Sequence, residues 1–297
     1  MIGKAPYGGA PFRVGKSFKA TGSAGGFFTM KIFSILEAKL RQILDYCYAR
    51  WPQAVPDRDR LQHCKIISHR GDYDNHNIFE NTIAAFDRAE AQGVWGIEFD
   101  LRWTKDLNPV VIHDADLGRV FGLNHSIRQM ALTELKSSCR LVPSLAEMIQ
   151  RYGQKIHLMI EIKAEHYPDP CAQNRILKDL LSSLEPGADY HLLTLAPDMF
   201  DLIECVPRSA LLPVARLNFR RLSKLAIEQD YSGIAGHYLL LTRSRLKKHE
   251  AFNQKLATGY VNSKNCLFRE LNRSVEWIFS DNAVELQKVV NHLLQKR

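Results

Sequence analysis

Short apolar runs alternate with helical patterns from about residue 61 to the C-terminus. The runs are rich in Ile, Leu and Val, as in buried strands, and amphipathic stretches with helical spacing follow most of them. The predicted strands are 65–68, 94–101, 109–112, 157–162, 191–195, 211–215, 233–239, 257–261 and 275–280. The predicted helices are 81–92, 145–151, 173–184, 198–206, 221–229, 243–253 and 284–294. This alternation predicts a parallel sheet, and the length favours its closure into an α/β (β/α)₈ TIM barrel.

The first 60 residues have a different pattern. Residues 1–29 hold seven of the 17 glycines and no acidic residue, which predicts a disordered segment. Met30 is a second candidate for the natural start. Residues 30–50 show the spacing of an amphipathic helix, and a linker to residue 60 follows. This helix either packs against the domain, the interpretation that we favour, or lies on an anionic membrane surface. The barrel domain is then expected at 61–297.

The charge distribution argues against nucleic acid as a partner. The chain carries a net charge of +8, but residues 1–60 alone hold ten basic and four acidic residues. The predicted barrel is therefore nearly neutral. No apolar run is long enough for a membrane-spanning helix. The six cysteines are scattered without a Cys-x-x-Cys pair, which fits reduced thiols in the cytoplasm. We expect a cytoplasmic protein, with peripheral membrane contact through residues 30–50 left open.

Polar residues gather where the apolar runs end, which in a βα barrel is the active face. Glu98 and Asp100 lie two positions apart on one strand and so share a face, as do Glu161 and Lys163 on another. The full set is His69, Arg70, Glu98, Asp100, His113, Glu161 and Lys163.

The residue types in this set are chemically complementary. The three carboxylates suit a hard divalent cation, the two histidines can exchange protons near neutral pH, and Arg70 and Lys163 match a phosphate. Each residue alone has an ordinary structural interpretation, such as an exposed ion pair. Their combination at the ends of four strands indicates metal-assisted cleavage of a phosphoester.

The same residues resemble the glycerophosphodiester phosphodiesterase family. The motifs that carry the resemblance are His69-Arg70-Gly71, Glu80-Asn81-Thr82, Glu98-Phe99-Asp100, Thr104-Lys105-Asp106, Val110 to Asp114, Val142 to Glu147, Glu161-Ile162-Lys163 and Phe279 to Asn282. The resemblance covers about residues 65–290. It implies a TIM barrel and the hydrolysis of glycerophosphodiesters to sn-glycerol 3-phosphate and an alcohol.

The resemblance also implies roles for individual residues. The metal ligands fall on Glu98, Asp100 and Glu161, for Mg²⁺ or Ca²⁺ with Mn²⁺ as a further candidate. The catalytic histidines fall on His69, as base, and His113, as acid; the residues themselves leave this order open. Arg70 and Lys163 fall on the phosphate-binding positions. Glu80 is expected on the substrate side of the site, with its exact role open.

The chain departs from the family pattern at three places. Phe79 stands where proline is usual, and the loop 72–78 is longer. Gly259-Tyr260-Val261-Asn262 replaces Trp-Thr-Val-Asn, which removes an aromatic wall. No large insertion follows His113, so we expect the compact form of the barrel.

Three rival functions remain at this level. A lysophospholipase D would use the same chemistry on a lipid at a membrane surface. A non-enzymatic binding protein could keep the barrel, but it would be expected to have lost a ligand or a histidine. A basic RNA-binding module is disfavoured, because the charge lies in the N-terminal segment without interleaved aromatic residues.

Overall fold

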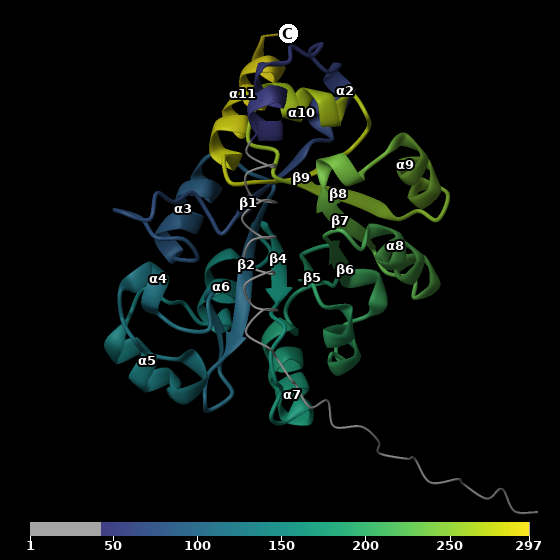
Figure 1. Ribbon diagram of the computed structural model, residues 1–297. Coiled ribbons are helices and arrows are strands. Elements are labelled where there is room, and N and C mark those ends of the chain that lie inside the picture. The colour runs from purple at the N-terminus through teal and green to yellow at the C-terminus, as the bar shows by residue number, and fades with distance from the viewer. Residues whose placement is uncertain (1–42, 297) are drawn as a thin grey trace, which may run out of the picture. The chain divides into compact units, whose positions relative to one another are not determined.

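The computed structural model describes residues 43–296, and eight parallel strands in it close into a barrel (Figure 1). Strand β1 pairs with β2 on one side and β9 on the other, which closes the ring. The barrel strands are β1 (Lys65–His69), β2 (Gly96–Trp103), β4 (His157–Ile162), β5 (Tyr190–Thr194), β6 (Leu211–Ala215), β7 (Gly233–His237), β8 (Lys255–Gly259) and β9 (Trp277–Ser280). The predicted TIM barrel is confirmed.

Helices connect most of the barrel strands. The main ones are α3 (Ile83–Ala91), α6 (Leu145–Tyr152), α7 (Pro170–Leu181), α8 (Phe219–Glu228), α9 (Arg243–Glu250), α10 (Lys264–Leu271) and α11 (Ala283–Gln295). The shorter ones are α2 (Arg58–Gln62), α4 (Gly118–Phe121) and α5 (Leu132–Ser138), and the 3₁₀ turns are η1 (Ile127–Gln129), η2 (Pro197–Leu202), η3 (Arg208–Ala210) and η4 (Tyr238–Leu240).

The helix predicted at 198–206 is wrong. Only the 3₁₀ turn η2 forms there. The reason lies in α7, where the side-chain oxygen of Asn174 accepts the backbone N–H groups of Glu204 and Cys205 at 2.8 and 3.3 Å. These N–H groups are therefore not available to continue a helix.

The strand predicted at 109–112 exists, but it is not a barrel strand. Strand β3 (Pro109–Val111) pairs with β2 in antiparallel orientation. Only residues 104–108 connect the two strands, and a parallel crossover needs a dozen residues or more. His113 is thus carried by a hairpin beside the barrel. The expectation that four parallel strands bear the charged residues is wrong in this respect.

The end of the predicted N-terminal helix packs against the barrel. Residues 43–50 are helical. Tyr238 donates a hydrogen bond of 2.6 Å from its hydroxyl to Asp45, and the ring of Tyr48 meets the Tyr238 ring edge-on. Asn265 donates to the carbonyl of Ala49 at 2.8 Å. For residues 43–50 these contacts agree with the favoured interpretation, which stays a prediction for the rest of the helix. The predictions for residues 1–29 and for the start of the helix lie outside the described residues.

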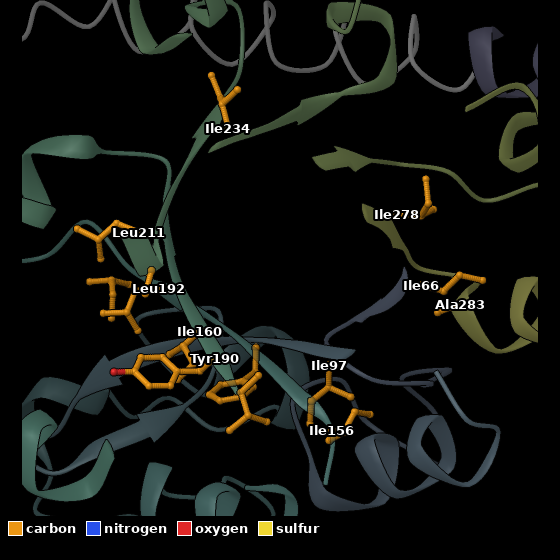
Figure 2. Close-up of a cluster of buried hydrophobic side chains, with 14 of the residues drawn as sticks. Ile66, Ile97, Ile156, Ile160, Tyr190, Leu192, Leu211, Ile234, Ile278 and Ala283 are labelled. Carbon is orange, nitrogen blue, oxygen red and sulfur yellow. The ribbon is translucent and has the colours of Figure 1, made fainter. Parts of the chain in front are cut away.

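Alternation along the strands sorts side chains between two apolar layers. Outward residues such as Ile66, Ile97 and Ile160 form the large cluster under the helices, several members of which surround the strands in Figure 2. Inward residues such as Ile67 and Met159 fill the barrel interior. Because side chains alternate along a strand with a period of two, the residues at the carboxyl edge that follow this inward set also face the barrel interior.

The amino end of the barrel is closed by a stack of rings. His157 lies 4.2 Å from Trp95 between ring centroids, and His191 meets Trp277 edge-on at 4.9 Å. His157 donates through Nδ1 to the carbonyl of Ala188 at 2.8 Å, so its Nε2 accepts a hydrogen bond from His191 Nδ1 at 2.8 Å. This arrangement needs both imidazoles neutral. Burial lowers the pKa of His157 to about 4 and that of His191 to about 3.

This histidine pair predicts a loss of stability in mild acid. The unfolded chain takes up protons below its pKa of 6.5, whereas the folded pair resists protonation down to about pH 4. The free energy of unfolding should therefore decrease as the pH is lowered from 6.5 to about 4. Replacing both residues, His157→Leu with His191→Leu, should remove about 4 kcal/mol of the difference between about pH 7 and about pH 5, about 2 kcal/mol for each histidine by linkage. Urea unfolding at both pH values measures this, and parallel pH dependences for the two proteins would contradict it.

Candidate active site

Three acidic side chains converge at the carboxyl edge of the barrel. Strand register places Asp100 beside Glu161 and His69 beside Glu98. Glu98, Asp100 and Glu161 are buried, and one carboxylate oxygen from each lies within 4.8 Å of the others. The structure thus brings together the three residues that the sequence singled out as candidate metal ligands.

Two cations lie against these carboxylates. Lys163 Nζ lies 2.6 Å from Asp100 and 2.5 Å from Glu161. Arg70 Nε lies 3.2 Å from Asp100, while its Nη1 donates to Glu80 at 2.9 Å. Both cations therefore occupy the charged centre itself, next to any anion that would enter it.

The buried charges shift one another's proton affinities. Burial raises the pKa of Glu98, and the neighbouring Asp100 charge adds to this, bringing it to about 8. Burial would also raise the pKa of Asp100, but Lys163 and Arg70 outweigh it and hold that pKa below its ordinary value. Asp100 is therefore the permanently charged member of the group.

His69 is held by an aspartate from the last strand. Its Nδ1 donates to Asp281 at 2.6 Å, which leaves Nε2 on the side of Glu98, 3.8 Å from that carboxylate. Burial lowers the pKa of His69, but Glu98 and Asp281 outweigh it and raise that pKa to about 9. Asn262 donates to the other oxygen of Asp281 at 3.2 Å, so the aspartate is itself oriented.

His113 is held in a similar way from the β3 hairpin. Its Nδ1 donates to Asp114 at 2.7 Å, and its carbonyl accepts a 2.8 Å hydrogen bond from Arg102. Arg119 donates to the second oxygen of Asp114 at 2.5 Å. Burial lowers the pKa of His113. The two histidines thus share one arrangement, a carboxylate on Nδ1, in opposite electrostatic settings.

Glu80 lies outside the group of three carboxylates. Arg119 donates to it from two guanidinium nitrogens at 2.5 and 3.0 Å, and Arg70 and Asn75 donate to it at 2.9 and 3.0 Å. The carboxylate therefore orients Arg70 and joins the loop after β1 to the loop after β3. The expectation that it lies on the substrate side remains a prediction.

The loop after β1 is built for close approach. Arg70 and Gly71 have positive φ values of 58° and 86°. A Cβ at Gly71 would lie 2.6 Å from that of Ala85 on α3, so only glycine fits. Asn81, also at positive φ, donates from its amide to Asp100 at 2.8 Å. The loop thus orients one of the three carboxylates from the opposite side to Lys163.

Sequence reasoning missed the residues that orient the histidines. Asp281, Asn262, Asp114 and Arg119 were present in the quoted motifs or beside them, but none was assigned to the site. For Asp281 the signal is the alternation along β9: Trp277 and Phe279 face the barrel interior, and Asp281 is the next residue at the same spacing of two. For Asp114 and Arg119 the five-residue spacing gives no such signal, since their side chains meet only through the fold of the loop.

The donor set fits a hard divalent cation. All ligand atoms offered by Glu98, Asp100 and Glu161 are carboxylate oxygens. Asp100 Oδ1 is buried and accepts no hydrogen bond of good geometry among the described residues, although Lys163 lies close. A lone pair there remains available to a metal ion.

Comparison with known proteins agrees with this geometry. A sequence model of the glycerophosphoryl diester phosphodiesterase family matches residues 69–200. The chain is 35% identical over 125 residues to a glycerophosphodiester phosphodiesterase of Caldanaerobacter subterraneus subsp. tengcongensis, covering 38% of this chain and 51% of that one. It is 30% identical over 129 residues to one of Bacillus altitudinis, covering 39% and 52%. The chain thus spans about half the length of these relatives.

Solved structures share the fold over most of the chain. A glycerophosphodiester phosphodiesterase of Thermotoga maritima superposes with a TM-score of 0.64 at 21% identity, covering 76% of this chain and 98% of that one. An Oleispira antarctica phosphodiesterase in complex with its product sn-glycerol-3-phosphate superposes with a TM-score of 0.60 at 19% identity, covering 76% and 96%.

The fold is the barrel that these phosphodiesterase structures share. Residues 69–200 match the glycerophosphoryl diester phosphodiesterase family, and the chain resembles members of that family over about this range.

The carboxylate group predicts that divalent cations stabilise the folded protein. A cation that binds only the folded chain stabilises it by about 2.7 kcal/mol at a concentration about a hundredfold above Kd. Mg²⁺ or Ca²⁺ should therefore raise the thermal midpoint, and Asp100→Asn and Glu161→Gln should abolish the rise. Calorimetry with and without cation measures it. Glu204→Gln, an exposed acid elsewhere, serves as control, and an equal rise in all four proteins would rule out this site.

Proposed function

We propose that the chain hydrolyses glycerophosphodiesters to sn-glycerol 3-phosphate and an alcohol, with a divalent cation as cofactor. One observation carries the proposal. Two histidines and two cations lie around three buried carboxylates at the barrel mouth, in a chain whose residues 69–200 match this family's sequence model. The substrate is inferred from that match and from the product bound to the Oleispira antarctica relative.

The residues divide into three roles under this proposal. Glu98, Asp100 and Glu161 would hold Mg²⁺, Ca²⁺ or Mn²⁺, and the bound ion would supply positive charge to the phosphate. Arg70 and Lys163 stabilise the negative charge that develops on the phosphoryl oxygens.

The histidines exchange protons with the reacting groups. One takes the proton of the attacking hydroxyl, and the other protonates the leaving alcohol. The family resemblance makes His69 the base and His113 the acid. The charge distribution of the cation-free protein favours the opposite order, with His69 as acid and His113 as base, because it raises the pKa of His69 and lowers that of His113. A cation on Glu98 offsets the charge that raises the His69 value, so the order must be decided by kinetics.

A lysophospholipid is the alternative substrate. Leu217 and Leu239, in the loops after β6 and β7, are 73% and 38% exposed at the same end of the barrel as the site. Apolar side chains in such a position suit a lipid better than a water-soluble diester. The reaction and the residue roles would be unchanged.

A headgroup assay tests the proposed function. Purified protein should release choline from glycerophosphocholine, lose this activity in excess chelator and regain it with Mg²⁺, Mn²⁺ or Ca²⁺. Asp100→Asn should be inactive under all of these conditions, whereas Glu204→Gln should behave as the unchanged protein. Preference for dispersed lysophosphatidylcholine would favour the alternative. Full turnover with chelator and no retained metal would refute cation dependence, and no turnover of either substrate would refute the function.

The two histidines should be separable by leaving group. His69→Ala and His113→Ala should each lower kcat by roughly 10²–10⁴-fold on a natural diester, the usual range for positioned proton transfer. A substrate with an acidic leaving group needs no protonation, so it should rescue only the variant that lacks the acid. We expect rescue of His113→Ala. Asp281→Asn should resemble His69→Ala in direction, because it removes the carboxylate that orients that ring.

The controls for this comparison are folding and metal binding. Both alanine variants should keep the thermal midpoint rise with cation, since the three carboxylates remain. Rescue of His69→Ala in place of His113→Ala would reverse the assignment. Near-normal turnover of both variants on the natural diester would show that the histidines are structural.

A further inference from the structure

The positive charge of the barrel is concentrated in one stretch of the chain. Residues 216–250 hold eight Lys and Arg against three Asp and Glu, a net of +5. The rest of residues 61–297 holds 22 basic and 25 acidic residues, a net of −3. The barrel is nearly neutral as a whole, but the loop after β6, α8 and α9 together carry a basic surface.

The placement of this charge opposes helix stability. Arg220 and Arg221 lie in the first turn of α8, and Arg243 begins α9; neither helix has an acidic residue in its first turn. A helix N-terminus carries partial positive charge, so basic residues there are unfavourable. The first turns lie near the barrel mouth, because α8 and α9 follow the carboxyl ends of β6 and β7. Folding alone gives no reason for this arrangement.

The charges are also unpaired within the part of the chain that the structure describes. Arg220, Arg221, Arg243, Lys247 and Lys248 are exposed and form no ion pair with residues 43–296. The single ion pair of this stretch joins Lys224 to Glu228 at 3.5 Å, both exposed. A surface with this many cations and so few counter-charges attracts anions from solution.

Exposed apolar side chains lie among these cations. Leu217 follows Arg216 directly and is 73% exposed, the largest exposure among the large hydrophobic side chains of the described residues. Leu239, in η4 after the neighbouring strand β7, is 38% exposed. Next to it, Tyr238 holds the helix of residues 43–50 through Asp45. Tyr238 thus joins η4 to the described end of that helix.

We propose that this surface, defined by Arg216, Leu217, Arg220, Arg221, Leu239 and Arg243, docks on an anionic lipid bilayer. Its cations meet the headgroups, and the two leucines enter the boundary with the acyl chains. An RNA partner fits less well, because single strands are held by stacking on exposed aromatic rings, and a leucine offers none. Docking in this orientation turns the barrel mouth toward the lipid surface. The proposal concerns binding and does not depend on the reaction at the site.

Vesicle co-sedimentation of the full chain tests the proposal. The protein should sediment with vesicles of phosphatidylcholine mixed with phosphatidylglycerol, and much less with phosphatidylcholine alone. Arg220→Gln with Arg221→Gln should weaken partitioning about thirtyfold, since one basic residue near an anionic leaflet contributes roughly a factor of five. Leu217→Ser should weaken it further in the same vesicles.

A matched control separates this surface from charge in general. Arg175→Gln with Lys178→Gln removes two exposed cations from α7, and it should leave sedimentation within about twofold of the unchanged protein, the loss expected from general charge being small. All variants should keep the same thermal midpoint. Equal sedimentation of the α8 and α7 variants would overturn the proposal, as would binding that ignores the anionic lipid. Displacement from vesicles by single-stranded RNA, lost on changing Arg220 and Arg221, would assign the surface to RNA instead.

Discussion

Three carboxylates share one small volume at the barrel mouth, and Arg70 and Lys163 are what allow the folded chain to bury them. Removing a charged carboxylate from water without a partner is strongly unfavourable. Here Asp100 lies within 3.2 Å of both cations, while Glu98, farther from them, has its pKa raised to about 8. The balance is therefore incomplete without a further positive charge. A divalent cation would complete it.

The surroundings of this group serve to keep it in place. Glu80 binds both Arg70 and Arg119, and Arg119 continues to Asp114 and so to His113. The loops after β1 and β3 are therefore tied together through charged hydrogen bonds, which are stronger than neutral ones. On the other side, Asp281 from β9 holds His69. Each histidine is thus oriented from a different element, and a change in one loop need not disturb both.

Much of this site could be predicted from the sequence because strands impose parity. Glu98 with Asp100, and Glu161 with Lys163, lie two apart on strands whose intervening residues are apolar, so their common face could be inferred without coordinates. The position of His113 could not be inferred in the same way, since an antiparallel hairpin and a barrel strand have the same apolar pattern. The length of the connection, residues 104–108, held the information. Contacts such as Arg119 with Glu80 depend on loop conformation, which has no period to detect.

The two ends of the barrel bury polar groups by opposite means. At the amino end, His157 and His191 are neutral, hydrogen-bonded to one another and covered by tryptophan rings, so that no charge is left to attract a ligand. At the carboxyl end, Asp100 keeps its charge through ion pairs with Lys163 and Arg70, and Glu98 and Glu161 offer oxygens close enough to share one metal ion with it. Both sets face the barrel interior, and β4 carries a member of each, His157 and Glu161. The two ends of the barrel differ in the segments that they carry. The carboxyl ends of the strands carry those that supply Arg70, His113 and the basic first turns of α8 and α9. The proposed chemistry and the proposed docking surface therefore fall at one end of the molecule for the same structural reason.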